Sequence, residues 1–400
     1  MTDEGKLAIE GGRPVRSRPM PARYAFGEAE FAMVREVYEH YRAKAVDPGY
    51  QGVFEERYCA AFVESMGGGY ADSVATGTVA VYLALAALDL PEGSEVVVSP
   101  ITDPGSISAI IFNRLVPRLA DAMPGRYAMG PEEFLARLSA RTRAVLVVHA
   151  AGQAVDVAAI VAEAGRRGIR VVEDCSQAHG ARIGGRCVGT FGDIAAFSTM
   201  YRKAHMTGAS GGMVYTRDQG LHRRAMALAD RGKPRWDPAF DDRDPTNYLF
   251  PALNLHTDEI SCAIGLASLA RLPETIRKRL AYIRGIDRLT RESNLCAPYG
   301  WTDGDSPFYY PIMVRTEALR CDKLAFSRAV LAEGIGLNPH YKYLVCDWPW
   351  AKPHLADEFN CPQARASRDA SFCLYVNENY GEEEIEDTVS AIRKVERAMT

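Results

Sequence analysis

A lysine and an aspartate about thirty residues apart stand where an active site would need them. Asp174 ends one apolar strand pattern, and Lys203 follows the next such pattern. A lysine amine can form a Schiff base with pyridoxal 5'-phosphate (PLP), and a buried carboxylate can pair with the ring nitrogen of that cofactor. Desolvation would lower the pKa of the lysine, so that it could also move a proton. The pair therefore predicts a PLP site with Lys203 and Asp174 as its catalytic residues.

Three further segments could hold the rest of such a cofactor. Thr76, Gly77 and Thr78 precede an apolar helix pattern. The N–H groups at a helix start favour an anion, so this turn predicts a phosphate cradle, although alone it could be a simple helix cap. Ser198 could add a second hydroxyl to the phosphate. Gln177 could donate a hydrogen bond to the ring oxygen, or it could bond the backbone of its own loop.

Strand and helix patterns alternate from about residue 70 to 275. Near-continuous apolar strands separated by helices are typical of a mostly parallel sheet covered on both faces, whose ligands bind at the carboxyl ends of the strands. The strand patterns are 94–98, 144–148, 169–172, 194–197 and 212–216. We expect a large α/β domain over residues 1–275, including an irregular N-terminal arm, and a smaller α+β domain over residues 276–400.

Composition narrows the class of protein. The chain is 47% hydrophobic and 24% charged with a formal net charge of -4, and its basic clusters are short, which argues against a nucleic-acid partner. Its apolar stretches are shorter than a bilayer span, so we expect no membrane anchor. Nine scattered cysteines predict reduced thiols in a cytoplasmic protein. The histidines lack the spacing of metal ligands, so no metal site is expected.

These segments together resemble the DegT/DnrJ/StrS-type sugar aminotransferases, a family of PLP enzymes of fold type I. The resemblance runs from about residue 8 to 398. It is strongest in five segments: Thr76–Ala80, Gly152–Asp156, Glu173–Ala181, Gly189–Lys203 and Asn254–Gly265.

The resemblance implies a fold, an assembly and a reaction. The large domain would hold a mostly parallel seven-stranded sheet between helices. The enzyme would be a homodimer with shared sites, in which Asn254 reaches the phosphate of the neighbouring subunit. L-Glutamate or glutamine would load the cofactor as pyridoxamine 5'-phosphate, and a keto- or aldehydo-sugar would then accept the amine in a ping-pong scheme. Such a reaction belongs to the biosynthesis of amino sugars, polysaccharides or natural products.

Three departures from the family pattern concern the substrate more than the reaction. Asp103 stands where an aromatic residue often stacks on the ring. The segment Gly208–Gly212 is one residue longer than usual and lacks its acid. His256 replaces an arginine. Asp103 and His256 are therefore candidate substrate contacts, together with three residues elsewhere: His205, Tyr341 and Lys342. We also expect loop 233–253 to shape the acceptor pocket.

Several alternatives remain open at the level of sequence. The acceptor could be a nucleotide-linked ketosugar, a free sugar or the terminal aldehyde of an eight-carbon sugar acid. The reaction could instead be a PLP-dependent dehydration or rearrangement, although the related dehydratases carry histidine in place of the lysine, which argues against that branch here. A member that binds PLP without turnover is disfavoured because Lys203, Asp174 and the phosphate turn are all present.

Overall fold

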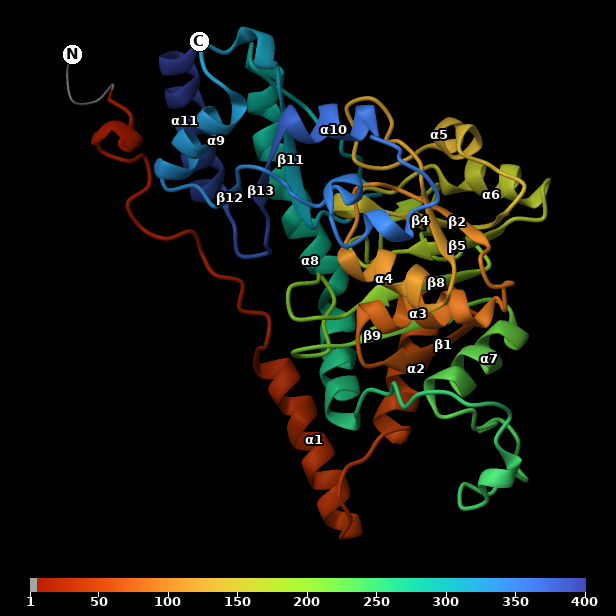
Figure 1. Cartoon of the computed structure of the whole chain (residues 1–400). Coiled ribbons are helices and arrows are strands. Elements are labelled where there is room, and N and C mark those ends of the chain that lie inside the picture. Colours follow the sequence, from red (N-terminus) through yellow and green to blue (C-terminus); the bar gives the residue numbers. More distant parts are fainter. Residues whose placement is uncertain (1–5) are drawn as a thin grey trace.

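The computed structural model describes residues 6–400, apart from the side chains of residues 289 and 290. It centres on a seven-stranded sheet (Figure 1). The strand order is β1-β9-β8-β5-β4-β2-β3. β9 runs antiparallel to both neighbours, and the other pairings are parallel. The strands are β1 (Tyr70–Val74), β2 (Glu95–Val98), β3 (Val116–Leu119), β4 (Thr142–Val148), β5 (Arg170–Asp174), β8 (Ile194–Ser198) and β9 (Gly212–Thr216). The mostly parallel sheet predicted from the sequence is confirmed.

Helices cover both faces of this sheet. Alternate residues of one strand enter different cores: Val96 and Val98 pack with α3, α4 and α7, whereas Val97 packs toward α5 and α6. A third cluster holds α1, α2 and α8 against β8 and β9. The helices are α1 (Glu28–Lys44), α2 (Val53–Ser65), α3 (Gly77–Ala87), α4 (Pro104–Phe112), α5 (Pro131–Ala136), α6 (Val157–Gly165), α7 (Gln219–Ala229) and α8 (Glu259–Glu292). Burial on both faces explains why the central strands read as continuous apolar runs.

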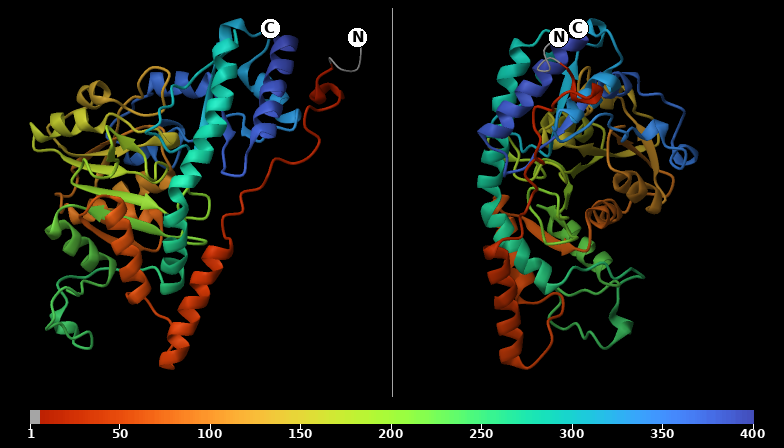
Figure 2. Two further views of the ribbon diagram at one scale, coloured as in Figure 1. Left: turned by 180° about the vertical axis from the view of Figure 1, so that it is seen from behind. Right: turned by 90° about the vertical axis from the view of Figure 1, so that its left-hand side faces the viewer.

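A second, smaller sheet packs beside the C-terminal part of α8, which contributes Tyr282, Ile283 and Ile286 to its core. It is antiparallel, in the order β10-β11-β13-β12, and packs with α9 and α11. The elements of this part of the chain are β10 (Cys296–Ala297), β11 (Tyr309–Val314), α9 (Lys323–Ala332), β12 (Leu337–Asn338), β13 (Ser371–Tyr375) and α11 (Glu382–Met399). Between β12 and β13, α10 (Pro362–Asp369) packs with its Ala364 against the core of the large sheet. α8 runs unbroken past both sheets (Figure 2). It passes through the expected domain boundary near residue 275, and the division into two domains stays a prediction.

The N-terminal arm runs from the small sheet to α1 (Figure 1). Arg16 anchors it, because this buried guanidinium lies 3.0 Å from a carboxylate oxygen of Glu384 and 2.6 Å from one of Asp387, both on α11. Within residues 6–400, the helices are too short or too polar to cross a membrane.

Candidate active site

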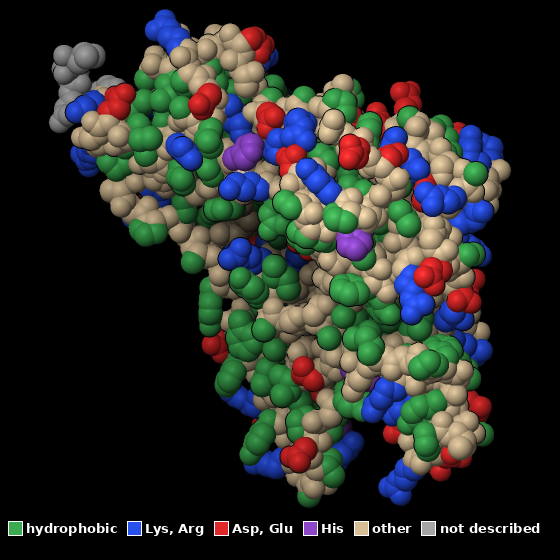
Figure 3. Space-filling view, viewed as in Figure 1, with side chains coloured by type: hydrophobic (Ala, Val, Ile, Leu, Met, Phe, Trp, Pro, Cys, Tyr) green, Lys and Arg blue, Asp and Glu red, His purple; other side chains and the backbone are tan. Residues whose placement is uncertain are grey.

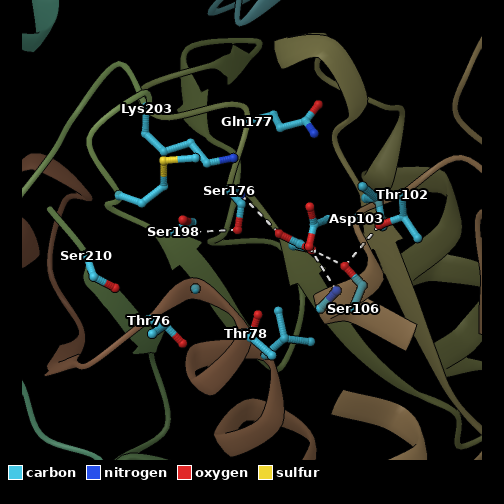
Figure 4. A pocket seen from close by; sticks show the side chains of 16 residues that line it. Thr76, Thr78, Thr102, Asp103, Ser106, Ser176, Gln177, Ser198, Lys203 and Ser210 are labelled. Carbon is cyan, nitrogen blue, oxygen red and sulfur yellow. Dashed lines mark hydrogen bonds between the residues drawn. The ribbon is translucent and has the colours of Figure 1, made fainter. Parts of the chain in front are cut away.

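A cavity of about 220 Å³ opens at the carboxyl ends of the parallel strands (Figure 4). Its walls come from the ends of β4, β5 and β8, from the starts of α3 and α4, and from the loop after β8. Eight residues singled out from the sequence line it: Thr76, Gly77, Thr78, Asp103, Asp174, Gln177, Ser198 and Lys203. The fold thus gathers residues from four separate stretches of chain into one site, at the edge of the sheet where parallel folds bind ligands.

Asp174 has both carboxylate oxygens engaged before any ligand is considered. Its Oδ2 accepts a hydrogen bond from Ser106 Oγ at 2.8 Å, and its Oδ1 accepts one from the backbone N–H of Ser176 at 3.1 Å. The residue is 5% exposed. Both donors are neutral, so the negative charge remains available to a positively charged group in the cavity.

Lys203 is buried beside the same cavity. Burial lowers the pKa of its amine, while the charges of Asp174 and Asp103 act in the opposite direction. Its Nζ lies 4.4 Å from the ring centroid of Phe308. A lysine with a lowered pKa has more of the neutral amine that attacks a carbonyl carbon, which is the state a Schiff-base lysine needs.

The start of α3 fits a phosphate group. Thr76 caps this helix, because its Oγ1 accepts a hydrogen bond from Val79 N at 3.0 Å. A Cβ built on Gly77 would lie 2.3 Å from Ser198 Cβ, so only glycine lets the helix start approach the end of β8. The hydroxyls of Thr78 and Ser198 line the same space. Together with the buried lysine and carboxylate, this close approach fits a cofactor that carries both a phosphate and a ring nitrogen.

Gln177 bonds the backbone of the neighbouring loop after β4, and its contact with the cofactor stays a prediction. Its Oε1 accepts a hydrogen bond from Ala151 N at 2.7 Å and so supports a residue with a left-handed backbone (φ 62°). This leaves the amide nitrogen as the group able to donate into the cavity.

Behind β8, His179 Nε2 lies 2.7 Å from the carbonyl oxygen of Ser198. Because a carbonyl only accepts, Nε2 carries the proton. Burial lowers the pKa of this histidine to about 4, so the ring is neutral near pH 7.

Three predicted residues lie away from the cavity lining. His205 is fully buried, with its Nε2 2.6 Å from the hydroxyl of Tyr58. His256 Nε2 lies 3.1 Å from Asp230 Oδ1. Asn254 is exposed and forms a β-bridge with Asp230. Within one chain, the structure therefore does not bring these side chains to the cavity.

Tyr341 and Lys342 belong to a segment that passes close to the mouth of the site. Leu344 forms a β-bridge with Ile101, and Val345 N donates to Pro100 O at 2.8 Å, which places this segment beside Asp103. The rings of Tyr341 and Tyr343 are stacked, with their centroids 4.9 Å apart, and Lys342 is exposed. On the face shown in Figure 3, the surface is hollowed beside the small sheet, with Lys and Arg side chains on the rim.

Sequence reasoning missed several lining residues. Ser106 and Thr102 stand behind Asp174, Ser176 Oγ accepts from Ser198 N at 3.0 Å, and Met200 and Ser210 complete the wall. One signal could have found the first two, because hydroxyl residues four positions apart follow the end of a predicted strand and begin a helix. The other three sit in irregular loops, where spacing predicts no direction for a side chain.

One buried group has the residue types of a metal site, namely His149, Glu173 and Cys175. Burial acts to raise the pKa of Glu173, but the bond from His149 Nε2 and those from backbone N–H groups hold it below its usual value. Three of these N–H groups come from the loop Gly189–Gly192, at 2.7 Å each. Burial also keeps the pKa of Cys175 well above that of a free thiol. Glu173 therefore stabilises the loop before β8.

Comparisons with known proteins agree with this geometry. Residues 27–393 match the model of the DegT/DnrJ/EryC1/StrS aminotransferase family. The chain is 36% identical over 350 residues to an L-glutamine:2-deoxy-scyllo-inosose aminotransferase of Streptomyces lividus, covering 84% of this chain and 81% of that one. It is 33% identical over 229 residues to GDP-perosamine synthase of Escherichia coli O157:H7, covering 57% and 61%. The solved aminotransferase of Psychrobacter cryohalolentis aligns with a TM-score of 0.86 and 26% identity, over 96% of this chain and 99% of that one.

Proposed function

Because the chain belongs to the DegT/DnrJ/EryC1/StrS aminotransferase family, we propose that it moves an amino group from L-glutamine or L-glutamate to a ketone on a six-membered polyol ring. Family membership makes the chain a PLP-dependent sugar aminotransferase, and PLP is its cofactor. When bound, PLP supplies an electron sink for the carbon that loses or gains the amine. The donor, the acceptor and the role of each residue belong to the proposal.

Three residues would perform the chemistry. Lys203 would attach to the cofactor. Afterwards, as a free amine, it would carry the proton between the substrate carbon that bears the amine and the cofactor carbon that receives it. Asp174 would accept the ring N–H, and its fixed orientation supports this role. Gln177 would donate its amide N–H to the ring oxygen. The observation that carries the proposal is the meeting of buried Lys203 and buried Asp174 in one cavity.

The phosphate would be held by groups of two subunits. Thr76, Gly77, Thr78 and Ser198 supply one side. Asn254 of the partner subunit would supply the other, which agrees with its exposure away from the cavity of its own chain. Large exposed apolar side chains gather on the arm, on α1 and near the start of α8, and support a homodimer: Tyr24, Phe31, Tyr38, Leu249, Leu253 and Ile260.

The acceptor would meet the other wall of the cavity. Among the charged lining residues, Asp103 has been assigned no contact with the cofactor, so its carboxylate can accept hydrogen bonds from hydroxyl or ammonium groups of the acceptor. Tyr341, Lys342 and loop 233–253 would enclose the rest of the ring. His205 and His256 bond groups outside the cavity of their own chain, so we assign neither of them to the acceptor. We also propose that the enzyme works in the cytoplasm, where its thiols stay reduced.

A spectrum of the purified holoenzyme tests the proposal. Adding L-glutamine or L-glutamate should replace the long-wavelength band of the lysine-bound cofactor by the shorter-wavelength band of its amine form. Adding 2-deoxy-scyllo-inosose or a nucleotide-linked ketosugar should then restore the first band and identify the acceptor. Lys203→Ala should abolish the first band. A wild-type band that neither donor changes would refute the transamination.

A further inference from the structure

Two hydroxyl side chains form a directed relay behind the catalytic carboxylate. Thr102 Oγ1 lies 2.9 Å from Ser106 Oγ, which lies 2.8 Å from Asp174 Oδ2 (Figure 4). A carboxylate only accepts hydrogen bonds, so the single hydroxyl proton of Ser106 must point to Asp174. Ser106 can then only accept from Thr102, and the direction of both bonds is fixed. Thr102 and Ser106 are each 2% exposed.

We propose that Ser106, supported by Thr102, is the positioning residue that aims Asp174 at the ring nitrogen of the cofactor. The inference rests on the proposed role of Asp174 in PLP binding. Ser176 N holds the other oxygen at 3.1 Å, so two donors at different oxygens fix the rotation of the carboxylate plane. A carboxylate fixed in this way loses little conformational freedom when it pairs with a ring N–H.

The neutrality of the relay matters as much as its geometry. An arginine bonded to Asp174 would fix the carboxylate as well, but it would also compensate the charge that the ring nitrogen needs. Hydroxyl and backbone N–H donors stabilise the charged carboxylate without opposing it by a full positive charge. The relay therefore orients Asp174 and places no full positive charge beside its carboxylate.

A purely structural role for Ser106 predicts different behaviour. Ser106 lies in the first turn of α4, where loss of its hydroxyl would destabilise the fold without changing the electrostatics of the cofactor. Ser99 offers a matched control, because it is also fully buried and its Oγ accepts from Met129 N at 3.1 Å, outside the relay. The two serines separate a general loss of stability from a specific effect on the cofactor.

The test measures the resting holoenzyme without substrate. In Ser106→Ala, we expect PLP affinity to fall about tenfold, the size of effect of one hydrogen bond to a charged group, and the pH midpoint of the bound-cofactor absorbance to shift. Ser106→Thr should restore both quantities. Thr102→Val keeps the shape of the side chain and should give a smaller shift in the same direction. Ser99→Ala should lower the melting temperature and leave the midpoint unchanged.

The design separates the relay from the proposed function. A folded Ser106→Ala holoenzyme with wild-type affinity and midpoint would overturn the relay. If Ser106→Ala does not fold, Thr102→Val decides, and an unchanged midpoint in that variant would overturn it. Ser106→Ala should add no further loss of affinity in an Asp174→Asn background, because the relay then has no carboxylate to aim. A wild-type protein that forms no band with PLP would instead refute the proposed function.

Discussion

The floor and the rim of the cavity are built from different kinds of sequence. The floor, formed by Gly77, Asp174, Lys203 and their neighbours, lies at strand ends and helix starts of the large sheet. The rim is formed by Asp103, residue 308 and residues 341–342. Asp103 comes from the large sheet's side, whereas residues 308 and 341–342 belong to the smaller sheet and its loops. Local signals in the sequence therefore encode the floor, whereas the rim exists only after two remote parts of the chain have met.

Substitutions in the floor of the cavity should have the largest effects. Gly77→Ala puts a Cβ 2.3 Å from Ser198 Cβ, so the start of α3 must move away from β8. Overpacking of this kind costs about 1–3 kcal/mol of the free energy of unfolding, and the displaced N–H groups should no longer hold phosphate. We expect the variant to lose PLP during dialysis and to show neither half-reaction.

A second glycine gives the control for this change. Gly165 ends α6, and a Cβ there would meet no atom within 4 Å. Gly165→Ala should keep the cofactor and be neutral or stabilising by about 0.5–1 kcal/mol, because alanine restricts the unfolded chain. Retention of PLP by Gly77→Ala would mean that the phosphate lies elsewhere.

The floor should also be the part of the site that is sensitive to acid. His179 has a pKa of about 4 in the folded protein, below its ordinary value of 6.5, because it is buried. Between these values the unfolded chain binds a proton that the folded chain does not, so the free energy of unfolding falls as the pH drops. From pH 7.5 to pH 5 this histidine should account for a loss of about 2 kcal/mol.

Urea unfolding at both pH values measures this loss. His179→Gln can still donate to the carbonyl of Ser198 but does not titrate, so it should lose less stability on acidification than the wild type. Titrating groups remote from His179 are present in both proteins and cancel in the comparison. Equal losses in the two proteins would show that His179 takes no part in the acid response.

The sequence predicts the elements of the floor better than those of the rim. The apolar runs that became β2, β4, β5, β8 and β9 were read correctly because burial on both faces removes polar residues. β1 and β3 were missed, since both are edge strands whose polar residues or proline break the apolar pattern. Asp174 ends β5 and Lys203 follows β8, so two strands that the sequence predicts bring them to the same edge of the sheet.

Local sequence patterns do not predict the directions of side chains in loops. His205 lies only two residues after Lys203, yet it turns into the layer of α2, where it meets Tyr58. The β-bridge between Ile101 and Leu344 joins residues far apart in sequence, and no local period encodes such a contact. The hydroxyl relay behind Asp174 could have been suspected from the spacing of Thr102 and Ser106, but not its direction.

Substitutions in the rim should have smaller effects, and only on the half-reaction with the acceptor. Asp103 caps α4 by accepting a hydrogen bond from Gly105 N at 2.8 Å, and asparagine caps helices equally well, so Asp103→Asn removes the charge and keeps the fold. We expect kcat/KM for the acceptor to fall about tenfold, since a bond to a charged group becomes one to a neutral amide, while the first half-reaction with L-glutamine stays within about twofold. Asp322→Asn makes the same change at the cap of α9, away from the cavity, and should alter neither rate. Equal losses in both half-reactions would move Asp103 from the rim to the floor, because only a residue that serves the cofactor affects donor and acceptor alike.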